Sequence, residues 1–359
     1  MLHENPDWYP PFAAAFDAEG VEHEQWLLGG GALDMDAAPP PGVYWSRMSA
    51  SSHTRGNVFA KDHARAVLGW LESHGRRVVG GRRVLELEVS KADQHAALRA
   101  AGFDVPRTIA VAGRGDLVSA AGKLPVPFIV KHNQGGKGLG VHRFESVVEF
   151  ADHLDSAEYV APVDGITLLQ EYVTPAEPYI TRVEVVGGEY MYAITADIAR
   201  GGFELCPADA CALDARPDAE GVDAEGADSG STDVGSADVG SADVGSADVG
   251  AAAAPSLFAL RAGFDDHPII GRYLDFAGRH GIEIAGFEFI ETADGRLVTY
   301  DVNTTTNYNA EVEAVAPRSA ARQVARFLGG LLADSGGAVA GTAGAAAAPA
   351  AGARRTERR

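Results

Sequence analysis

Residues 286–309 read GFEFIETADGRLVTYDVNTTTNYN, and this stretch decides how the rest of the chain is interpreted. Apolar side chains recur at every second position in two runs, which is the spacing of β-strands: Phe287, Phe289, Val298, Tyr300 and Val302. Asp294-Gly295 lies between the runs, and this dipeptide favours a two-residue type I′ hairpin loop. The stretch therefore predicts two antiparallel strands joined by a tight turn.

Two carboxylates meet on the polar face of this predicted hairpin. If Ala293 faces Arg296 across the loop, counting outward places Glu288 directly opposite Asp301, with side chains about 5 Å apart. Asn303 lies two residues beyond Asp301 and joins the same face. Opposed carboxylates repel each other unless a proton, a base or a metal lies between them, and oxygen ligands favour Mg²⁺ or Mn²⁺. An ordinary acidic pair on a solvated face is the alternative that spacing alone leaves open.

Composition narrows the class of protein. The chain has 359 residues, enough for two or three domains, and a net charge of −20. This charge argues against nucleic acid or an anionic membrane as a general partner. The two cysteines, Cys206 and Cys211, fit a reducing cytosol. Because the N-terminus lacks the features of a signal peptide and no apolar run approaches ~20 residues, we expect a cytoplasmic protein.

Residues 1–90 are predicted to form a small α/β unit. Strand and helix patterns alternate along them, which is typical of an open parallel sheet. The polar stretch 49–57 follows a predicted strand, where ligand-binding loops of such sheets lie, although a plain connecting loop fits equally well. The predicted helices are Trp8–Glu19 and Ala60–His74, and the predicted strands are His23–Leu28, Gly42–Met48 and Arg77–Val79.

Residues 91–167 are predicted to form a second unit around a glycine-rich loop. A helix over Leu85–Ala101 carries Lys91, and the loop lies between the strands Phe128–Lys131 and Val141–Phe144. This strand–loop–strand order differs from the strand–loop–helix order of a Walker A or Rossmann motif. Such a loop can fold over phosphates and donate backbone N–H groups, while Lys131 supplies positive charge. Glycine-rich hairpins also occur without this role.

Residues 168–333 are predicted to form a third unit, which an acidic insertion interrupts. Residues 214–255 contain STDVG and three copies of SADVG, with ten acidic residues and one arginine. This composition predicts that the insertion is disordered. The Gly/Ala-rich tail 334–359 is predicted to be disordered as well. The structured elements expected in this unit are the strands Leu168–Val173, Tyr179–Val186 and Glu189–Ile194, the helices Ile269–Gly281 and Arg318–Ala333, and the opening hairpin.

Four features follow one another in a fixed order: Lys91 on a helix, Lys131 before the glycine loop, the sequence QEYV at 170–173, and an acidic pair ending in DVN at 301–303. In combination they resemble the ATP-grasp superfamily, and within it the RimK-like and glutathione-synthetase-like carboxylate–amine ligases. The resemblance covers about residues 42–332 without the insertion. It implies an α+β chain with an α/β N-terminal pre-ATP-grasp domain and two lobes that clamp ATP.

The resemblance also implies roles for individual residues. Lys91 and Lys131 would reach ATP phosphates, and Arg182 would approach the transferred phosphoryl group. Glu177 would bind the ribose hydroxyls. Asp301 departs from the glutamate that many relatives have at this position. The glycine loop, with Gly135, Gly136, Lys137 and Gly138, would cover the phosphates; Gln170, Glu171, Tyr172 and Val173 would form the hinge that binds adenine; Glu288, Asp301 and Asn303 would hold Mg²⁺ or Mn²⁺, as two ions.

The implied reaction joins a small-molecule or peptide carboxylate to an amino acid or amine through an acyl phosphate. A kinase that phosphorylates a hydroxyl acceptor is the alternative, and a non-catalytic nucleotide-binding module is a third reading that the intact lysines and acidic pair disfavour. The resemblance leaves room for a homo-oligomer. Residues expected near the acceptor are Asp197, Arg200 and Asn307, and, from the N-terminal unit, Arg47, Ser49, His53 and Arg55.

Overall fold

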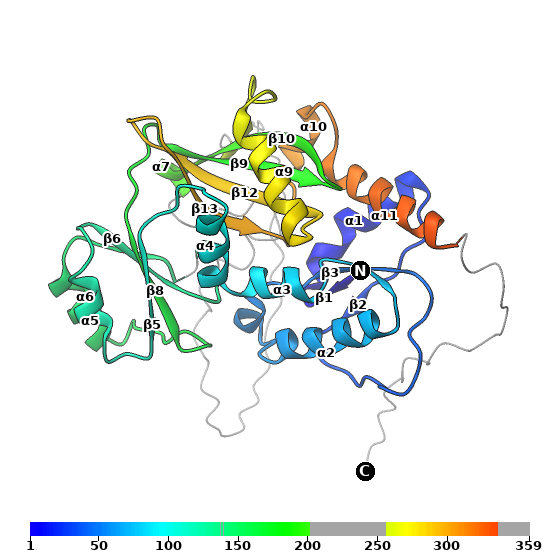
Figure 1. Cartoon of the computed structure of the whole chain (residues 1–359), viewed down its shortest axis with the longest axis horizontal. Helices are drawn as coiled ribbons and strands as arrows, with labels where there is room; N and C mark the ends of the chain where they lie inside the picture. Colours follow the sequence, from blue (N-terminus) through cyan, green and yellow to red (C-terminus); the bar gives the residue numbers. More distant parts are fainter. Residues whose placement is uncertain (137, 139, 202–255, 337–359) are drawn as a thin grey trace, which may run out of the picture.

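The computed structural model describes residues 1–136, 138, 140–201 and 256–336. These residues form three separate β-sheets. Figure 1 shows the N-terminal sheet at the lower right, the central sheet at the left and the C-terminal sheet across the top. The acidic insertion, Cys206, Cys211 and the tail from residue 337 lie outside the described residues. Within the described part, no helix has both the length and the apolar character needed to cross a membrane.

The N-terminal sheet has the strand order β2-β1-β3-β4, and all its pairs are parallel. The predicted open parallel sheet is therefore confirmed. The sequence pattern does not reveal β1, because two residues are too few for a periodic signal. The elements are β1 (Leu2–His3), η1 (Pro6–Trp8), α1 (Tyr9–Glu19), β2 (Trp26–Leu27), β3 (Val43–Arg47), η2 (Ser52–Arg55), α2 (Ala60–Ser73) and β4 (Arg77–Val79).

A break between two helices determines where Lys91 lies. The pattern predicts one helix from Leu85, but the structure has α3 (Arg82–Val89) and α4 (Lys91–Ala100). Ser90 separates them with an extended backbone, and its side chain accepts a hydrogen bond from the Asp93 N–H. A serine at this position satisfies one of the N–H groups that a helix start leaves unpaired. Lys91 therefore begins α4 instead of lying inside a longer helix.

The central sheet is antiparallel and has the strand order β5-β8-β6-β7. The glycine-rich loop joins β6 to β7, so the predicted strand–loop–strand order is confirmed. The predicted boundary at residue 168 divides β8, although the whole strand pairs with β5 and β6. The elements are β5 (Thr108–Ala112), α5 (Leu117–Ala121), β6 (Phe128–His132), β7 (His142–Phe144), α6 (Val147–Asp155) and β8 (Ile166–Glu171).

The C-terminal sheet has the antiparallel strand order β11-β10-β9-β12-β13. Helix α9 packs on one face against Phe287 and Phe289, and α11 packs on the other face together with α1 of the N-terminal unit. The elements are β9 (Tyr179–Val186), β10 (Glu189–Asp197), α7 (Ile198–Gly201), β11 (Phe258–Leu260), α9 (Pro268–His280), β12 (Ile284–Glu291), β13 (Leu297–Asn303), α10 (Ala310–Val315) and α11 (Ala320–Gly336). Helix α11 thus continues three residues into the predicted tail.

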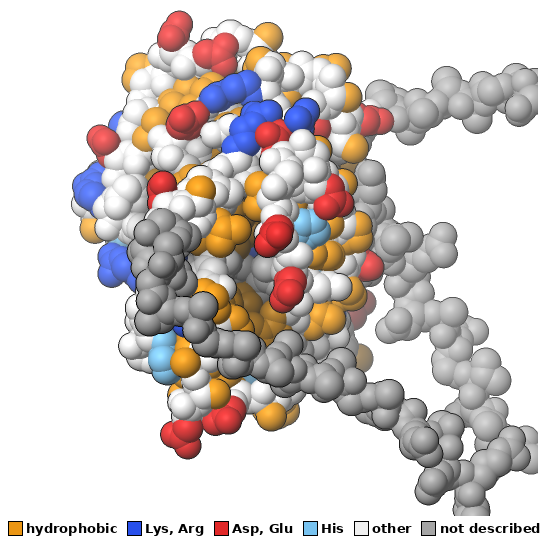
Figure 2. Space-filling view, turned by 90° about the vertical axis from the view of Figure 1, so that its right-hand side faces the viewer, with side chains coloured by type: hydrophobic (Ala, Val, Ile, Leu, Met, Phe, Trp, Pro, Cys, Tyr) orange, Lys and Arg blue, Asp and Glu red, His pale blue; other side chains and the backbone are white. Residues whose placement is uncertain are grey.

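Charged side chains of both signs lie side by side on the face that carries α1 and α11 (Figure 2). Arg322 and Arg326 of α11 both pair with Glu19 of α1. Exposed pairs of this kind contribute little to stability. The core between the same two helices, which includes Phe16 and Val324, is the larger stabilising contact.

Candidate active site

The hairpin of β12 and β13 forms the floor of the site. Glu288 pairs with Asp301, as the sequence pattern predicts, and Asn303 pairs with Gly286. The next strand, β9, continues the surface, because Glu288 also pairs with Arg182. Three neighbouring strands, β9, β12 and β13, therefore bring two carboxylates and a guanidinium to one region.

The hairpin reaches this register in a different way from the one predicted. Gly295 N–H donates to the Thr292 carbonyl at 2.9 Å, and Thr292 N–H donates to the Arg296 carbonyl at 3.0 Å. Three residues therefore make the turn, with Gly295 at φ +82°, and the predicted two-residue loop is wrong. The strand pairs next to the turn are consequently shifted by one residue from the predicted register.

A β-bulge at Tyr300 shifts the register back. Phe289 pairs with Thr299, whereas Glu288 pairs with Asp301, so Tyr300 is the extra residue. The two one-residue differences cancel, which is why Glu288 still meets Asp301. The bulge also removes Tyr300 from the predicted apolar face: its hydroxyl donates to Glu288 Oε2 at 2.8 Å and the residue lines the cavity.

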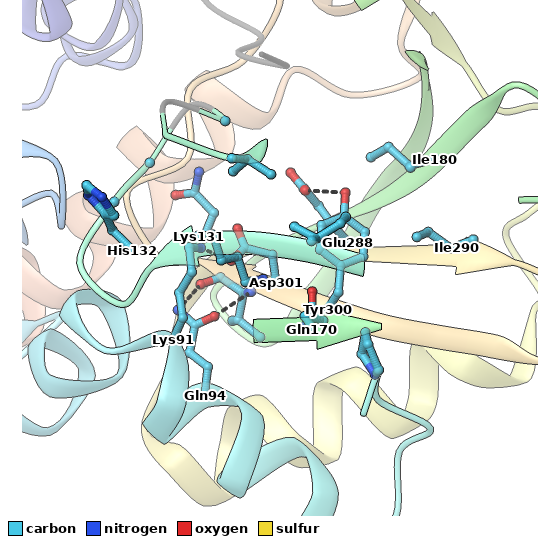
Figure 3. A pocket seen from close by; sticks show the side chains of 18 of the residues that line it. Lys91, Gln94, Lys131, His132, Gln170, Ile180, Glu288, Ile290, Tyr300 and Asp301 are labelled. Atoms are coloured by element: carbon cyan, nitrogen blue, oxygen red, sulfur yellow. Dashed lines mark hydrogen bonds and ion pairs between the residues drawn. The ribbon is translucent and has the colours of Figure 1, made fainter. Parts of the chain in front are cut away.

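Glu288 and Asp301 differ in the cations beside them. Glu288 Oε1 accepts a hydrogen bond from Arg182 at 2.9 Å. Burial raises the pKa of Glu288, Arg182 opposes this rise, and the neighbouring Asp301 adds to it. Asp301 forms an ion pair with Lys91 (Figure 3). Burial disfavours its ionised form, but this ion pair outweighs burial and lowers the pKa of Asp301.

The two lysines come from different elements, Lys91 from helix α4 and Lys131 from strand β6, and they converge at these carboxylates (Figure 3). The start of α4 is fixed to the end of β6 by Asn133, whose Oδ1 accepts from the Ala92 N–H at 2.8 Å. Its backbone carbonyl accepts from the Lys91 N–H at 3.3 Å. Lys131 of β6 is 7% exposed, and burial together with the nearby Lys91 lowers its pKa to about 8. Within the described residues Lys131 forms no ion pair, and the nearby Asp301 and Glu288 only partly oppose the lowering of its pKa.

A cavity of ≈390 Å³ joins these groups. Figure 3 shows Ile180 and Ile290 at one end and Lys91 and His132 at the other. Glu177 is exposed and Arg182 is enclosed behind Glu288, so neither lines the cavity, and Lys137 lies outside the described residues. The predicted site residues that do line it are Lys91, Lys131, Gly135, Gly136, Gly138, Gln170, Glu171, Tyr172, Val173, Glu288, Asp301 and Asn303.

The segment after β8 leaves backbone groups available to a ligand. The Glu171 carboxylate accepts from the Arg107 N–H at 2.9 Å, which anchors the end of the strand. Tyr172 and Val173 continue along the cavity, and neither makes a backbone–backbone hydrogen bond within the described part of the chain. An adenine edge needs such unpaired N–H and C=O groups.

Arg182 is 2% exposed and lies between two carboxylates. Its Nε donates to Glu184 at 2.6 Å, its Nη1 donates to Glu288 at 2.9 Å, and its Nη2 donates to the Thr306 hydroxyl. Burial disfavours its charge, but Glu184 and Glu288 raise the pKa of Arg182. Gly286 makes room for it, because a Cβ there would lie 2.5 Å from its Nε. In this arrangement, Arg182 influences the cavity indirectly, through its hydrogen bond to Glu288.

Comparison with known proteins identifies the architecture. No protein-family model matches the chain, and no curated protein matches it in sequence. Solved structures do match. A RimK domain ATP-grasp protein from Sphaerobacter thermophilus DSM 20745 is 16% identical, with a TM-score of 0.55, over 91% of this chain and 98% of that chain. The chain has the ATP-grasp fold.

Two further ATP-grasp neighbours extend the comparison. D-cycloserine synthetase DcsG is 16% identical, with a TM-score of 0.57, over 92% of this chain and 98% of that chain. The ATP-grasp ligase PsnB, solved with a minimal precursor, Mg and ADP, is 14% identical, with a TM-score of 0.54, over 91% and 95%. At these identities the likeness establishes the fold, so the roles of individual residues depend on the geometry of this chain.

The donor set at the ATP-grasp floor fits a hard cation. Glu288, Asp301 and Asn303 line one cavity, and carboxylate and amide oxygens suit Mg²⁺ or Mn²⁺. Asn303 Oδ1 also accepts a hydrogen bond from the Thr305 N–H at 2.9 Å, which fixes its orientation. Among the described residues, no group of three or more His, Cys, Asp or Glu side chains can hold a metal ion. Two carboxylates and one amide leave coordination positions open, which phosphate oxygens and water commonly fill around Mg²⁺.

Sequence reasoning misses two residues that hold this ATP-grasp site together. Gln94 of α4 donates to the carbonyls of Leu87 and Val302, each at 2.8 Å, and accepts from the Val302 N–H. Glu88 is buried and accepts from the Thr304 N–H and hydroxyl, each at 2.8 Å. Both fix the lysine-bearing helices against β13. Neither has a motif around it, so only the tertiary contacts reveal these roles.

The candidates for contact with an acceptor divide into two groups. Ser49 and Asn307 line the cavity. Arg55 instead pairs with Glu4 at 2.6 Å, and His53 lies 3.3 Å from Lys61. Arg47, Arg55, His53 and Asp197 are not among the described lining residues, and the Arg200 side chain is outside the described part.

Proposed function

We propose that this chain is an ATP- and Mg²⁺-dependent carboxylate–amine ligase. It would convert ATP, a carboxylate and an amine into ADP, phosphate and an amide. The observation that carries the proposal is the convergence of Lys91, Lys131, Glu288 and Asp301 on one cavity beside a glycine-rich loop. A cavity with cations at one position and paired carboxylates at another suits a nucleotide polyphosphate together with its metal ions.

Each charged group would have a defined part in phosphoryl transfer. Lys91 and Lys131 add fixed positive charge next to the phosphates, where negative charge develops. Mg²⁺, held by Glu288, Asp301 and Asn303 as two ions, would neutralise further charge on the phosphate oxygens. Arg182 orients Glu288 through its 2.9 Å hydrogen bond and opposes the rise in pKa that burial causes. Direct contact of Arg182 with the transferred phosphoryl group stays a prediction.

The acceptor carboxylate would form an acyl phosphate, which the amine attacks at the acyl carbon with loss of phosphate. Because an acyl phosphate hydrolyses in water, the cavity must exclude solvent. One feature supports this requirement. A Cβ added to Gly136 would lie 3.3 Å from Ser51 Oγ, so the glycine loop approaches the N-terminal unit closely at that point. Only a residue without a side chain allows this approach without displacement.

A RimK-like pairing of substrates is the most specific form of the proposal. The acceptor would be a small-molecule or peptide carboxylate, and the second substrate an amino acid or amine. The structural neighbours indicate the range of substrates to consider. One is named a D-cycloserine synthetase, and another is solved with a precursor. A cytoplasmic location, expected from the cysteine content, belongs to the same proposal.

The test is an assay of ADP release with ATP, Mg²⁺, a pool of amino acids and a pool of carboxylates. The proposal expects ADP release to require both pools and expects a product with the mass of the two substrates minus water. Release that needs only a hydroxyl compound and yields a stable phosphoester would establish the kinase alternative. The absence of ADP release with every combination would refute both enzymatic readings.

Changing Asp301→Asn should reduce ADP release by roughly a hundredfold or more, because the floor loses one negative charge and Lys91 loses its ion pair. Asp294→Asn is the matched control: it makes the same chemical change in the exposed turn of the same hairpin and should leave the rate unchanged. Retained activity in Asp301→Asn would overturn the metal assignment.

A further inference from the structure

Arg47 is fully buried, and within the described part of the chain no carboxylate forms an ion pair with it. Three aromatic rings surround its guanidinium, with centroids 4.4 Å away for Phe12, 5.1 Å for Trp45 and 5.4 Å for Trp8. Neither its Nε nor its Nη1 has a hydrogen-bond partner among the described residues. Burying a cation whose donors are unpaired costs free energy, so the position of Arg47 in the fold needs an explanation.

Within the described residues, the hydrogen bonds of Arg47 all come from Nη2 and reach one loop. This nitrogen donates to the Thr305 carbonyl at 2.9 Å, to the Thr306 carbonyl at 2.6 Å and to Asn307 Oδ1 at 2.8 Å. The loop follows β13 directly, and Thr305 and Asn307 line the cavity. Arg47 thus connects the N-terminal sheet to the cavity wall next to the carboxylate floor.

These contacts fix the orientation of the Asn307 amide. A guanidinium only donates hydrogen bonds, so the amide must direct its oxygen toward Arg47; a flipped amide would set donors against donors. The amide nitrogen is then the polar group of the side chain that is left for the cavity. Within the described residues, Asn307 Nδ2 makes no hydrogen bond. Two N–H donors are therefore available at a wall of the cavity.

We propose that Asn307 is a specificity-determining residue that donates a hydrogen bond to a carboxylate or carbonyl oxygen of the acceptor substrate, and that Arg47 is the positioning residue that holds its amide. This inference rests on the proposed ligase function. Arg47 needs no direct substrate contact in this role, which agrees with its complete burial. Its charge, which no ion pair within the described residues neutralises, also favours an anionic group on the other side of Asn307.

Asn307→Asp separates this role from a structural one. The new carboxylate keeps the shape of the side chain and gives the buried Arg47 an ion partner, so we expect the midpoint of thermal unfolding to rise by roughly 2–4 °C. Asn307→Ala removes the hydrogen bond and should lower the midpoint. If Asp and Ala lower it equally, the assigned orientation toward Arg47 is wrong. Arg47→Met in the Asn307→Asp background should remove the gain.

Measurements of activity test whether Asn307 donates a hydrogen bond to the acceptor. In the two-pool assay of ADP release, Asn307→Asp presents an oxygen to the acceptor in place of N–H groups, so we expect kcat/KM for the carboxylate to fall about thirtyfold or more. The KM for ATP should change by less than about threefold, because the lysines and carboxylates that face the nucleotide are intact. A merely structural role predicts a stable and fully active Asn307→Asp.

The outcomes distinguish failure of the inference from failure of the function. Full carboxylate kcat/KM in a stabilised Asn307→Asp would overturn the donor role while leaving the ligase intact. A wild-type chain that releases no ADP with any pool would refute the proposed function, and the acceptor role of Asn307 with it. The unfolding midpoints would then still decide whether Arg47 holds the amide.

Discussion

Two arginines of this chain are almost completely buried, Arg182 at 2% and Arg47 at 0% exposure, and their surroundings are opposite. Arg182 lies between the carboxylates of Glu184 and Glu288, which raise its pKa despite burial. Arg47 lies among aromatic rings and carbonyl oxygens, and burial lowers its pKa to about 10. The first guanidinium is compensated within the protein, whereas the second leaves positive charge beside the cavity.

This difference has consequences for how each region works. The Arg182 network is self-contained: removing one member leaves another buried charge without a partner. Arg47 keeps two nitrogens without a hydrogen bond and has no ion pair within the described residues, so a bound anion nearby would stabilise its charge. The two buried arginines therefore differ in whether the protein itself supplies their ion partners.

The largest effect should follow removal of the compensated arginine. Arg182→Met leaves Glu184 and Glu288 buried and unpaired, so we expect the free energy of unfolding to fall by about 3–5 kcal/mol in urea titration. The double variant with Glu184→Gln should recover part of this loss. A fall of less than about 1 kcal/mol in Arg182→Met would contradict the view that this network is stabilising.

Arg47→Met should cost less, about 1–2 kcal/mol, in the same titration. The loop carbonyls lose their donor, but a desolvated cation also disappears, and methionine can still fill the aromatic enclosure. Equal losses in the two arginine variants would mean that carboxylate compensation is not what distinguishes the two regions.

A third buried cation, Lys131, sharpens the comparison through pH. Its pKa is about 8 in the free chain because of burial and Lys91, and bound phosphates raise it. ATP affinity should therefore stay constant well below pH 8 and weaken as the pH rises through 8, by roughly tenfold at pH 9 relative to its low-pH value, as the free lysine loses its proton. Calorimetric titration at fixed Mg²⁺ measures this. Lys131→Met should bind more weakly and without this dependence on pH.

The smallest effect is expected at the surface. Arg326→Ala removes one exposed contact to Glu19, and Arg322 remains beside the same carboxylate. Screening by solvent makes such pairs weak, so the unfolding midpoint should stay within about 1 °C of the wild type. A much larger fall would show that α1 and α11 depend on this ion pair more than on the apolar residues between them.

Much of the fold was accessible to sequence patterns because its elements are periodic. The strand–loop–strand around the glycines, the β9–β10 hairpin and the parallel N-terminal sheet follow from alternation, turn residues and element order. Short or interrupted elements were not accessible. β1 has two residues, and the break at Ser90 depends on one side chain that caps α4.

The candidate site likewise has features that the sequence pattern predicts and features that it does not. Local pattern alone brought Glu288 opposite Asp301, since side chains on paired strands alternate with a period of two. It did so through the wrong turn, and the bulge at Tyr300 restored the register. No pattern reveals the bulge, because its extra residue is chosen by the contact of Tyr300 with Glu288 and not by periodicity.

The sequence by itself therefore determined the residue types that a phosphate and metal site needs, their order along the chain, and the strand spacing that pairs the carboxylates. Only the tertiary structure decided which charges are neutralised: Arg182 lies between two carboxylates, whereas Arg47 forms an ion pair with none in the described part of the chain. The physical reason is the distance along the chain over which each effect acts. Alternation and turn chemistry act over a few residues, whereas the electrostatic state of a buried group depends on neighbours from distant elements, such as the loop some 260 residues away that Arg47 holds.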